Sequence, residues 1–72
     1  MNKHLDYIGL NVKKARLAAG MTQEDLAREA EISSSIVSRL ETGRTMVSVE
    51  RLAEFALILD VHIQDFFVED EQ

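Results

Sequence analysis

The stretch from residue 22 to residue 44, TQEDLAREAEISSSIVSRLETGR, constrains the fold of this chain more than any other. Thr22 followed by Asp25 is a pattern with which helices begin, because both side chains can accept hydrogen bonds from backbone N–H groups near the helix end. Ser33 is a second candidate for that role, and Gly43 stands where a left-handed residue commonly ends a helix. The stretch therefore predicts two short helices joined by a tight turn. Such helices cannot bury their own apolar faces, so the rest of the chain must pack around them.

Apolar residues that recur every three or four positions predict further helices on both sides of this stretch. We expect helices over about residues 5–19, 23–30 and 34–42, a fourth that begins after Ser48, and a last short one over 63–67. Their expected inner positions are Leu5, Ile8, Val12, Ala15, Ala19, Leu26, Ala27, Ala30, Val37, Leu40, Leu52, Ala53, Phe55, Ala56, Leu59, Ile63, Phe66 and Phe67. Gly20 should end the first helix. The sequence thus predicts an all-α domain of five short helices, with a core over about residues 5–67 and an acidic tail over 68–72.

The net charge of −5 over 72 residues, taken as a whole, argues against a nucleic-acid partner. Residues 1–48 carry seven Lys or Arg against six Asp or Glu, whereas residues 49–72 carry one against seven. The acid is therefore concentrated away from the two-helix stretch. A nucleic acid could still bind there, with few ionic contacts to phosphates and with help from neutral donors and helix N-termini.

Several classes of protein and site are not expected. Cysteine is absent, so neither a disulfide framework nor a cysteine zinc site can form, which suits a reducing cytoplasm. No apolar run resembles a signal peptide or is long enough to span a bilayer. His4 and His62 are isolated and lack metal-ligand spacing. We therefore expect a cytoplasmic protein that is not an enzyme and holds no metal or cofactor.

The two-helix stretch resembles the helix-turn-helix of the phage repressor and Cro type, often called the xenobiotic response element family. The resemblance rests on Gly20-Met21-Thr22-Gln23, Leu26-Ala27, Ile32-Ser33, Val37-Ser38-Arg39-Leu40-Glu41 and Gly43. Further matches within residues 8–67 are Ile8-Gly9, Val12-Lys13, Arg16, Leu52, Ala56, Leu59, Val61 and Phe66-Phe67. It implies a lambda-repressor-like domain that binds double-stranded DNA, and a prokaryotic or phage context. This chain departs from the family pattern at Glu31, where the family usually has glycine, and at Leu57, where it often has a charged residue. We expect Glu31 to take a left-handed conformation despite its side chain.

The resemblance also implies roles for individual residues. The second helix of the pair would enter the major groove by its N-terminal end. The implied base contacts are Ser34, Ser35, Ser38 and Arg39, and the implied phosphate contacts are Thr22, Gln23, Ser33, Arg44 and Thr45. Thr22 and Ser33 can equally act as helix caps alone, and Arg39 as a solvated surface residue. The family commonly joins the positions of Arg16 and Glu41 in a partly buried ion pair, which would fix the tilt of the reading helix.

Met46, Val47 and Leu57 are unusually apolar for positions expected near the surface, although scattered exposure of such residues is normal. We expect them to form a surface for a second copy of the chain or for a partner protein. A two-fold dimer would place two reading helices about 34 Å apart on a palindromic operator, as suits a small transcriptional repressor. The alternative is a protein-binding module, such as an antitoxin that also binds its own promoter, or one that has lost DNA binding.

Overall fold

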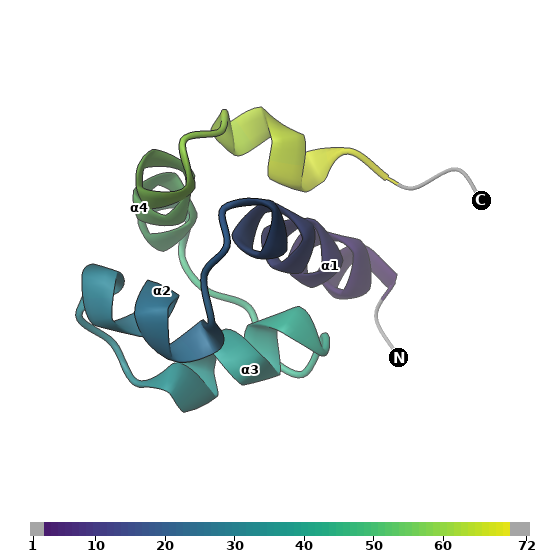
Figure 1. The fold of residues 1–72 in the computed structure, drawn as a ribbon. Coiled ribbons are helices and arrows are strands. Elements are labelled where there is room, and N and C mark those ends of the chain that lie inside the picture. The colour runs from purple at the N-terminus through teal and green to yellow at the C-terminus, as the bar shows by residue number, and fades with distance from the viewer. Residues whose placement is uncertain (1–2, 70–72) are drawn as a thin grey trace.

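The computed structural model describes residues 3–69, and their side chains from residue 7 onward. In chain order the elements are helices α1 (Lys3–Ala18), α2 (Gln23–Ala30), α3 (Ser34–Glu41) and α4 (Val49–Leu59), then a 3₁₀ turn η1 (Ile63–Phe67). Helix α1 lies between η1 on one side and α3 on the other, and α2 packs against both α3 and α4 (Figure 1). The expected all-α fold is confirmed, with a 3₁₀ turn where a fifth helix was predicted. Among residues 3–69, no helix is long and apolar enough to cross a bilayer.

One hydrophobic core holds these elements together. Its buried members are Ile8, Val12, Leu26, Ala27, Ala30, Val37, Leu40, Leu52, Phe55, Ala56, Leu59 and Phe66. All of these positions were expected to face inward. Ala15, Ala53 and Ile63 are only partly buried, and Leu5 lies outside the residues whose side chains are described.

Two expected core residues, Ala19 and Phe67, are exposed. Helix α1 ends at Ala18, so Ala19 falls in the turn and no longer continues the inner face of the helix. Phe67 is 42% exposed because a 3₁₀ turn has about three residues per turn. Ile63 and Phe66 therefore share its inner face, and the residue after Phe66 points away from the core. The prediction that Phe67 closes the core is wrong for this reason.

The helix ends largely follow the predicted pattern. The Thr22 hydroxyl accepts from the Asp25 N–H, and the Asp25 carboxylate accepts from the Thr22 N–H, each at 3.0 Å. The Ser48 hydroxyl accepts from the Arg51 N–H at 3.1 Å at the start of α4. Ser33 stands at the N-cap position of α3, but its hydroxyl bonds to the Ser35 hydroxyl at 2.8 Å and makes no cap bond. The expected Ser33 side-chain cap is therefore absent.

The tight turn between α2 and α3 contains Glu31, whose φ is 61°. This confirms the left-handed conformation that the sequence predicted there, at a cost of about 1 kcal/mol relative to glycine. Asp60, after α4, takes the same conformation with a φ of 59°, which was not predicted. In both cases the cap residue's N–H donates to carbonyls of the preceding helix turn, and these bonds hold the strained conformation.

Candidate nucleic-acid interface

Helix α3 has one face fixed in the core and one face available to a ligand. The side chains of Val37 and Leu40 are fully buried and point into the core. On the other side of the helix, Ser35 and Arg39 are exposed, and Ser34 and Ser38 are partly exposed. The four residues expected to contact bases therefore lie on the accessible side of one short helix. Ile36, between the two sides, is partly buried.

A buried ion pair joins α1 to the C-terminal end of α3, as the resemblance implied. The Arg16 guanidinium donates from Nε to Glu41 Oε2 at 2.7 Å and from Nη2 to Glu41 Oε1 at 3.0 Å. It also donates from Nη1 to the Met21 carbonyl at 2.8 Å, which ties the turn before α2 to the same group. The hydrogen bond to Glu41 raises the pKa of Arg16 against the opposing effect of burial.

Gln23, an expected phosphate contact, is the third partner in this network. Its side-chain amide donates from Nε2 to Glu41 Oε1 at 3.0 Å, so Glu41 connects α1, the start of α2 and α3. Gln23 is only partly buried, and its amide nitrogen carries two donor hydrogens. One is directed to Glu41, and the position of the side chain is thereby fixed at the N-terminal end of α2.

The remaining expected phosphate contacts differ in their exposure and in the contacts they already make. Thr22 acts first as a cap, since its hydroxyl accepts from the backbone of α2. Ser33 and Arg44 are exposed, and Thr45 is partly buried. Thr45 and Arg39 line one depression of about 400 Å³ beside α3. Its other lining residues are Ile32, Ile36, Met46, Val47, Ser48 and Arg51.

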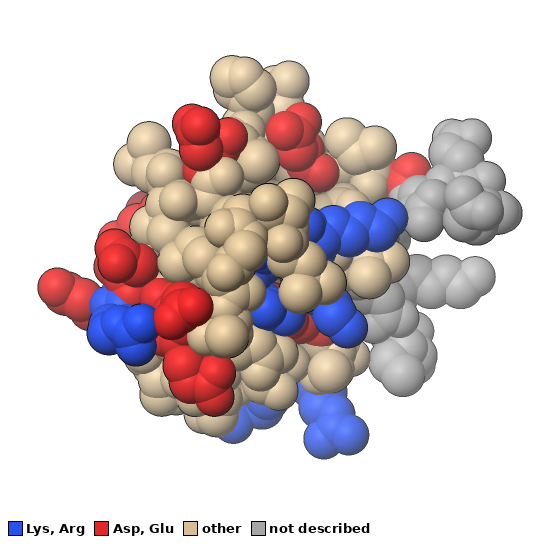
Figure 2. Space-filling view, viewed as in Figure 1, with Lys and Arg blue, Asp and Glu red and all other residues tan. Residues whose placement is uncertain are grey.

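The charges around the helix pair are unevenly distributed. In Figure 2, red side chains gather at the left and top of the molecule, and blue ones lie mainly at the lower right and bottom, toward α1 and α3. Arg28 is paired with Asp25, and Arg51 with Glu54, each at 2.7 Å. Within residues 7–69, neither Arg39 nor Arg44 has an ion-pair partner. These two arginines are the exposed cations that α3 and its C-terminal connector offer to an anionic ligand.

The structure does not bring Met46, Val47 and Leu57 together into one apolar surface. Val47 is partly buried against the core, and Met46 lies beside it in the depression next to α3. Leu57 is 83% exposed and lines a different depression, between α2 and α4. Met46 and Val47 precede the start of α4, whereas Leu57 lies near its C-terminal end.

Three residues that hold segments of the fold together were missed by sequence reasoning. Arg51 donates from Nη1 to the Ala30 carbonyl at 3.1 Å and so satisfies the C-terminal end of α2 from α4. Asn11 donates from Nδ2 to the carbonyls of Phe66 at 3.1 Å and Val68 at 2.7 Å, which anchors the end of η1 to α1. Gly9 was noted only as part of the family pattern, but a Cβ there would lie 1.9 Å from the Leu40 carbonyl oxygen. No local pattern indicates contacts between segments so far apart in the chain.

In the described part of the chain, no group of three or more His, Cys, Asp or Glu side chains is arranged to hold a metal ion.

Hydrogen bonds from the Thr22 backbone and hydroxyl, and from Arg28, lower the pKa of Asp25. These hydrogen bonds belong to the cap at the start of α2, so the lowered pKa of Asp25 follows from its structural role.

Comparisons with known proteins agree with this arrangement. A model of the helix-turn-helix family HTH_3 matches residues 12–66. An uncharacterized transcriptional regulator in the ATPase CF(0) region of Rhodospirillum rubrum is 36% identical over 70 residues, which are 96% of this chain and 65% of that relative. The chain thus spans just under two thirds of that relative's length.

Two solved structures are similar in both fold and sequence. The restriction-modification controller protein C.AhdI from Aeromonas hydrophila superimposes with a TM-score of 0.82 at 30% identity, over 88% of this chain and 96% of that one. The clp gene regulator ClgR from Corynebacterium glutamicum gives a TM-score of 0.83 at 30% identity, over 88% and 81% of the two chains. Since the family model covers most of the chain, including α2 and α3, this protein belongs to the helix-turn-helix family HTH_3, whose members are DNA-binding transcriptional regulators and not enzymes.

Proposed function

We propose that this chain reads a specific DNA sequence by placing the N-terminal part of α3 in the major groove. The observation that carries the proposal is the exposed side of α3, which presents Arg39 and three serines. Arg39 has no ion-pair partner among the described residues. The opposite side of the helix is held in the core by Val37 and Leu40. A helix fits the major groove, where each base pair presents its own pattern of donors and acceptors. The relatives are regulators, which supports the same function.

Arg39 is the proposed main reader of sequence. A guanidinium can donate two hydrogen bonds to O6 and N7 of guanine, which is worth about 1–3 kcal/mol of discrimination against another base. Ser34, Ser35 and Ser38 are short donors or acceptors that read less decisively and often through water. The operator should therefore contain one strongly preferred guanine in each half-site, with weaker preferences beside it.

The proposed phosphate contacts are Gln23, Thr22, Ser33, Arg44 and Thr45. Gln23 can donate its second amide hydrogen to a phosphate while the first holds Glu41. The Thr22 hydroxyl has one hydrogen, which is directed at the Asp25 carboxylate in this structure and would turn toward a phosphate on binding. Among these residues only Arg44 would make an ionic contact to a phosphate. Arg39 would add a second one if it bound a phosphate in place of a base. The slope of log affinity against log salt should then be shallow, about −2 for each subunit at most.

We further propose that the protein binds as a homodimer to a palindromic operator and represses transcription by occupying it. One eight-residue reading helix contacts too few base pairs for high specificity alone. Because Met46, Val47 and Leu57 do not form one patch, we assign the dimer contact to the C-terminal segment. There Phe67 and Val68 are 42% and 60% exposed, and Asn11 holds the backbone in place against α1.

Selection from a random duplex pool tests the DNA proposal, with wild type, Arg39→Ala and Lys13→Ala compared in parallel. Lys13 is an exposed cation on α1, so its variant loses the same charge outside α3. A palindromic consensus whose guanine preference is lost only in Arg39→Ala supports the proposal. No enrichment for wild type at low salt would contradict it.

Light scattering at high concentration tests the dimer separately. The wild type should have twice the monomer mass, and Val68→Ser with Phe67→Ser should reduce it to the monomer mass. Wild type that remains a monomer at high concentration would contradict the dimer, whatever the outcome of the selection.

A further inference from the structure

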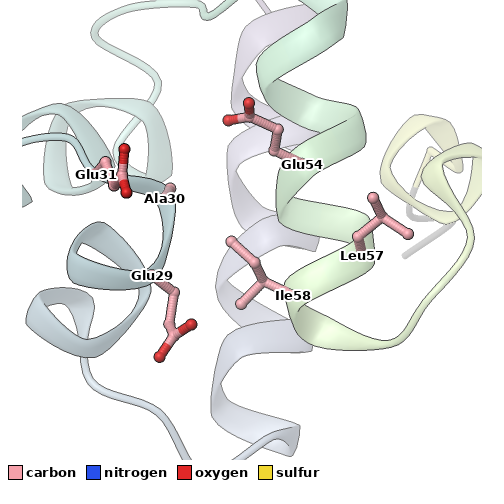
Figure 3. Close-up of a pocket in the computed structure, with 6 residues that line it drawn as sticks. All are labelled: Glu29, Ala30, Glu31, Glu54, Leu57 and Ile58. Atoms are coloured by element: carbon pink, nitrogen blue, oxygen red, sulfur yellow. The ribbon is translucent and has the colours of Figure 1, made fainter.

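We infer that the depression between α2 and α4 is a docking site for a segment of a partner protein that carries an apolar side chain between Lys or Arg residues. The depression has a volume of about 270 Å³ and is lined by Glu29, Ala30, Glu31, Glu54, Leu57 and Ile58. Figure 3 shows the residues of α2 and its cap on one side and those of α4 on the other. The inference goes beyond DNA binding and does not depend on it.

The apolar part of the site comes mainly from α4. Leu57 is the most exposed of the large apolar residues, at 83%, whereas its neighbour Ile58 is partly buried against the core. Ala30, which is buried, lines the same depression from the end of α2. A single exposed leucine is normal on a protein surface. Here the leucine borders a hollow with an apolar wall, into which a partner's apolar side chain can insert and contact both helices.

The charged residues of the site determine which charges a partner segment must carry. All three ionisable residues that line the depression are glutamates, and no Lys or Arg lines it. Arg51 pairs with Glu54 at 2.7 Å, and Arg28 pairs with Asp25, so neither cation reaches Glu29 or Glu31 in an ion pair. Within residues 7–69, Glu29 and Glu31 have no ion-pair partner and are exposed. A partner segment with Lys or Arg on either side of its apolar residue would complement them, and DNA would be repelled.

The geometry of the site is fixed by its surroundings. Glu31 is held at a φ of 61° by its N–H, which donates to carbonyls of α2. On the other wall, Arg51 orients Glu54 and at the same time donates to the Ala30 carbonyl at 3.1 Å. This single side chain thereby connects the two walls of the depression. A preformed site of this kind loses little conformational entropy when a partner binds.

A synthetic peptide with one leucine between arginines is the probe, followed by amide chemical shifts in ¹⁵N-labelled protein. Two control peptides replace the leucine by serine or the arginines by glutamates. The expected result is saturable shifts confined to residues 29–31 and 54–58, at peptide concentrations up to about 1 mM, with neither control peptide reproducing them. No saturable shifts with the probe peptide would overturn the inference. Shifts at these residues that depend on protein concentration without peptide would also overturn it, because a second copy would then be the occupant.

Matched variants separate this site from general adhesion to exposed apolar surface. Leu57→Ser should weaken peptide binding at least about tenfold, and Leu17→Ser, which removes a leucine 58% exposed on α1, should leave binding unchanged. Glu29→Gln with Glu31→Gln should also weaken binding and reduce its salt dependence. Because these side chains are exposed, we expect each variant to retain the wild-type midpoint of thermal unfolding, and this is checked first. Equal binding by wild type and Leu57→Ser would overturn the inference, while the DNA selection would be unaffected.

Discussion

Arg16 and Glu41 lie 25 positions apart in the chain and form a buried ion pair through two hydrogen bonds of 2.7 and 3.0 Å. The same carboxylate accepts from Gln23, and the same guanidinium donates to the Met21 carbonyl. Helix α1, the turn at Met21, the start of α2 and the end of α3 therefore share one polar centre. This centre fixes the position of α3 relative to the start of α2, which are the two elements proposed to contact DNA.

Glu41→Ala should reduce the free energy of unfolding by about 3–5 kcal/mol, because it leaves the Arg16 charge buried without a partner. Urea denaturation measures this change. Arg28→Ala, which breaks the exposed pair with Asp25, is the matched control and should cost less than about 1 kcal/mol. Arg16→Met together with Glu41→Leu should be more stable than Glu41→Ala, since no unpaired charge remains. Similar losses for Glu41→Ala and Arg28→Ala would show that the buried pair contributes no more than a surface pair.

Gly9→Ala should destabilise the protein although alanine favours helix by up to about 1 kcal/mol. The new Cβ would lie 1.9 Å from the Leu40 carbonyl oxygen and 2.9 Å from its carbon, so α1 and α3 must move apart. A net loss of about 1–3 kcal/mol is expected in urea denaturation. Gly20→Ala provides a comparison, since no atom lies within 4 Å of its Cβ and only its φ of 73° is unfavourable. A stabilised Gly9→Ala protein would contradict the close contact between α1 and α3.

Asn11→Ala should release the end of η1 from α1, because one side-chain amide donates to the carbonyls of both Phe66 and Val68. The loss should be about 1–3 kcal/mol, and amide hydrogen exchange should accelerate most in residues 63–68. Asn11→Asp, which has nearly the same shape, should be at least as harmful because it directs a carboxylate at two carbonyls. Unchanged exchange in residues 63–68 of both variants would exclude the anchoring role.

The Asp25 carboxylate should make the start of α2 sensitive to acid. Its pKa is lowered by hydrogen bonds from Thr22 and Arg28, so folding favours its charged form. The stability it provides is complete above its ordinary pKa of about 3.9 and is lost as the pH falls through the lower pKa of the folded state. Asp25→Asn should therefore be less stable than wild type near neutral pH, and the difference should shrink below about pH 4. Denaturation at several pH values measures the difference, and a ¹³C titration of the carboxylate gives its pKa directly. A difference that is the same at all pH values would contradict this explanation.

Patterns within the sequence were enough to predict the helix pair and most of the core. The capping pattern at Thr22, the cap at Ser48 and the apolar positions of the four helices were all predictable. These features depend on interactions within a few residues or on the period of one helix, and such information is present in any short window of sequence. The left-handed conformation of Glu31 and the ion pair of Arg16 and Glu41 were predicted only through the family resemblance.

Which distant groups meet became clear from the packing of the helices. It brought Asn11 to the end of η1, Arg51 to the end of α2 and Gly9 against α3, and it placed Leu57 and Met46 in separate depressions. It also turned the last segment into a 3₁₀ turn, which left Phe67 outside the core. These outcomes depend on the angles and distances at which helices pack. Helical periodicity defines which face of a helix is buried, but it does not specify the element that the face will contact.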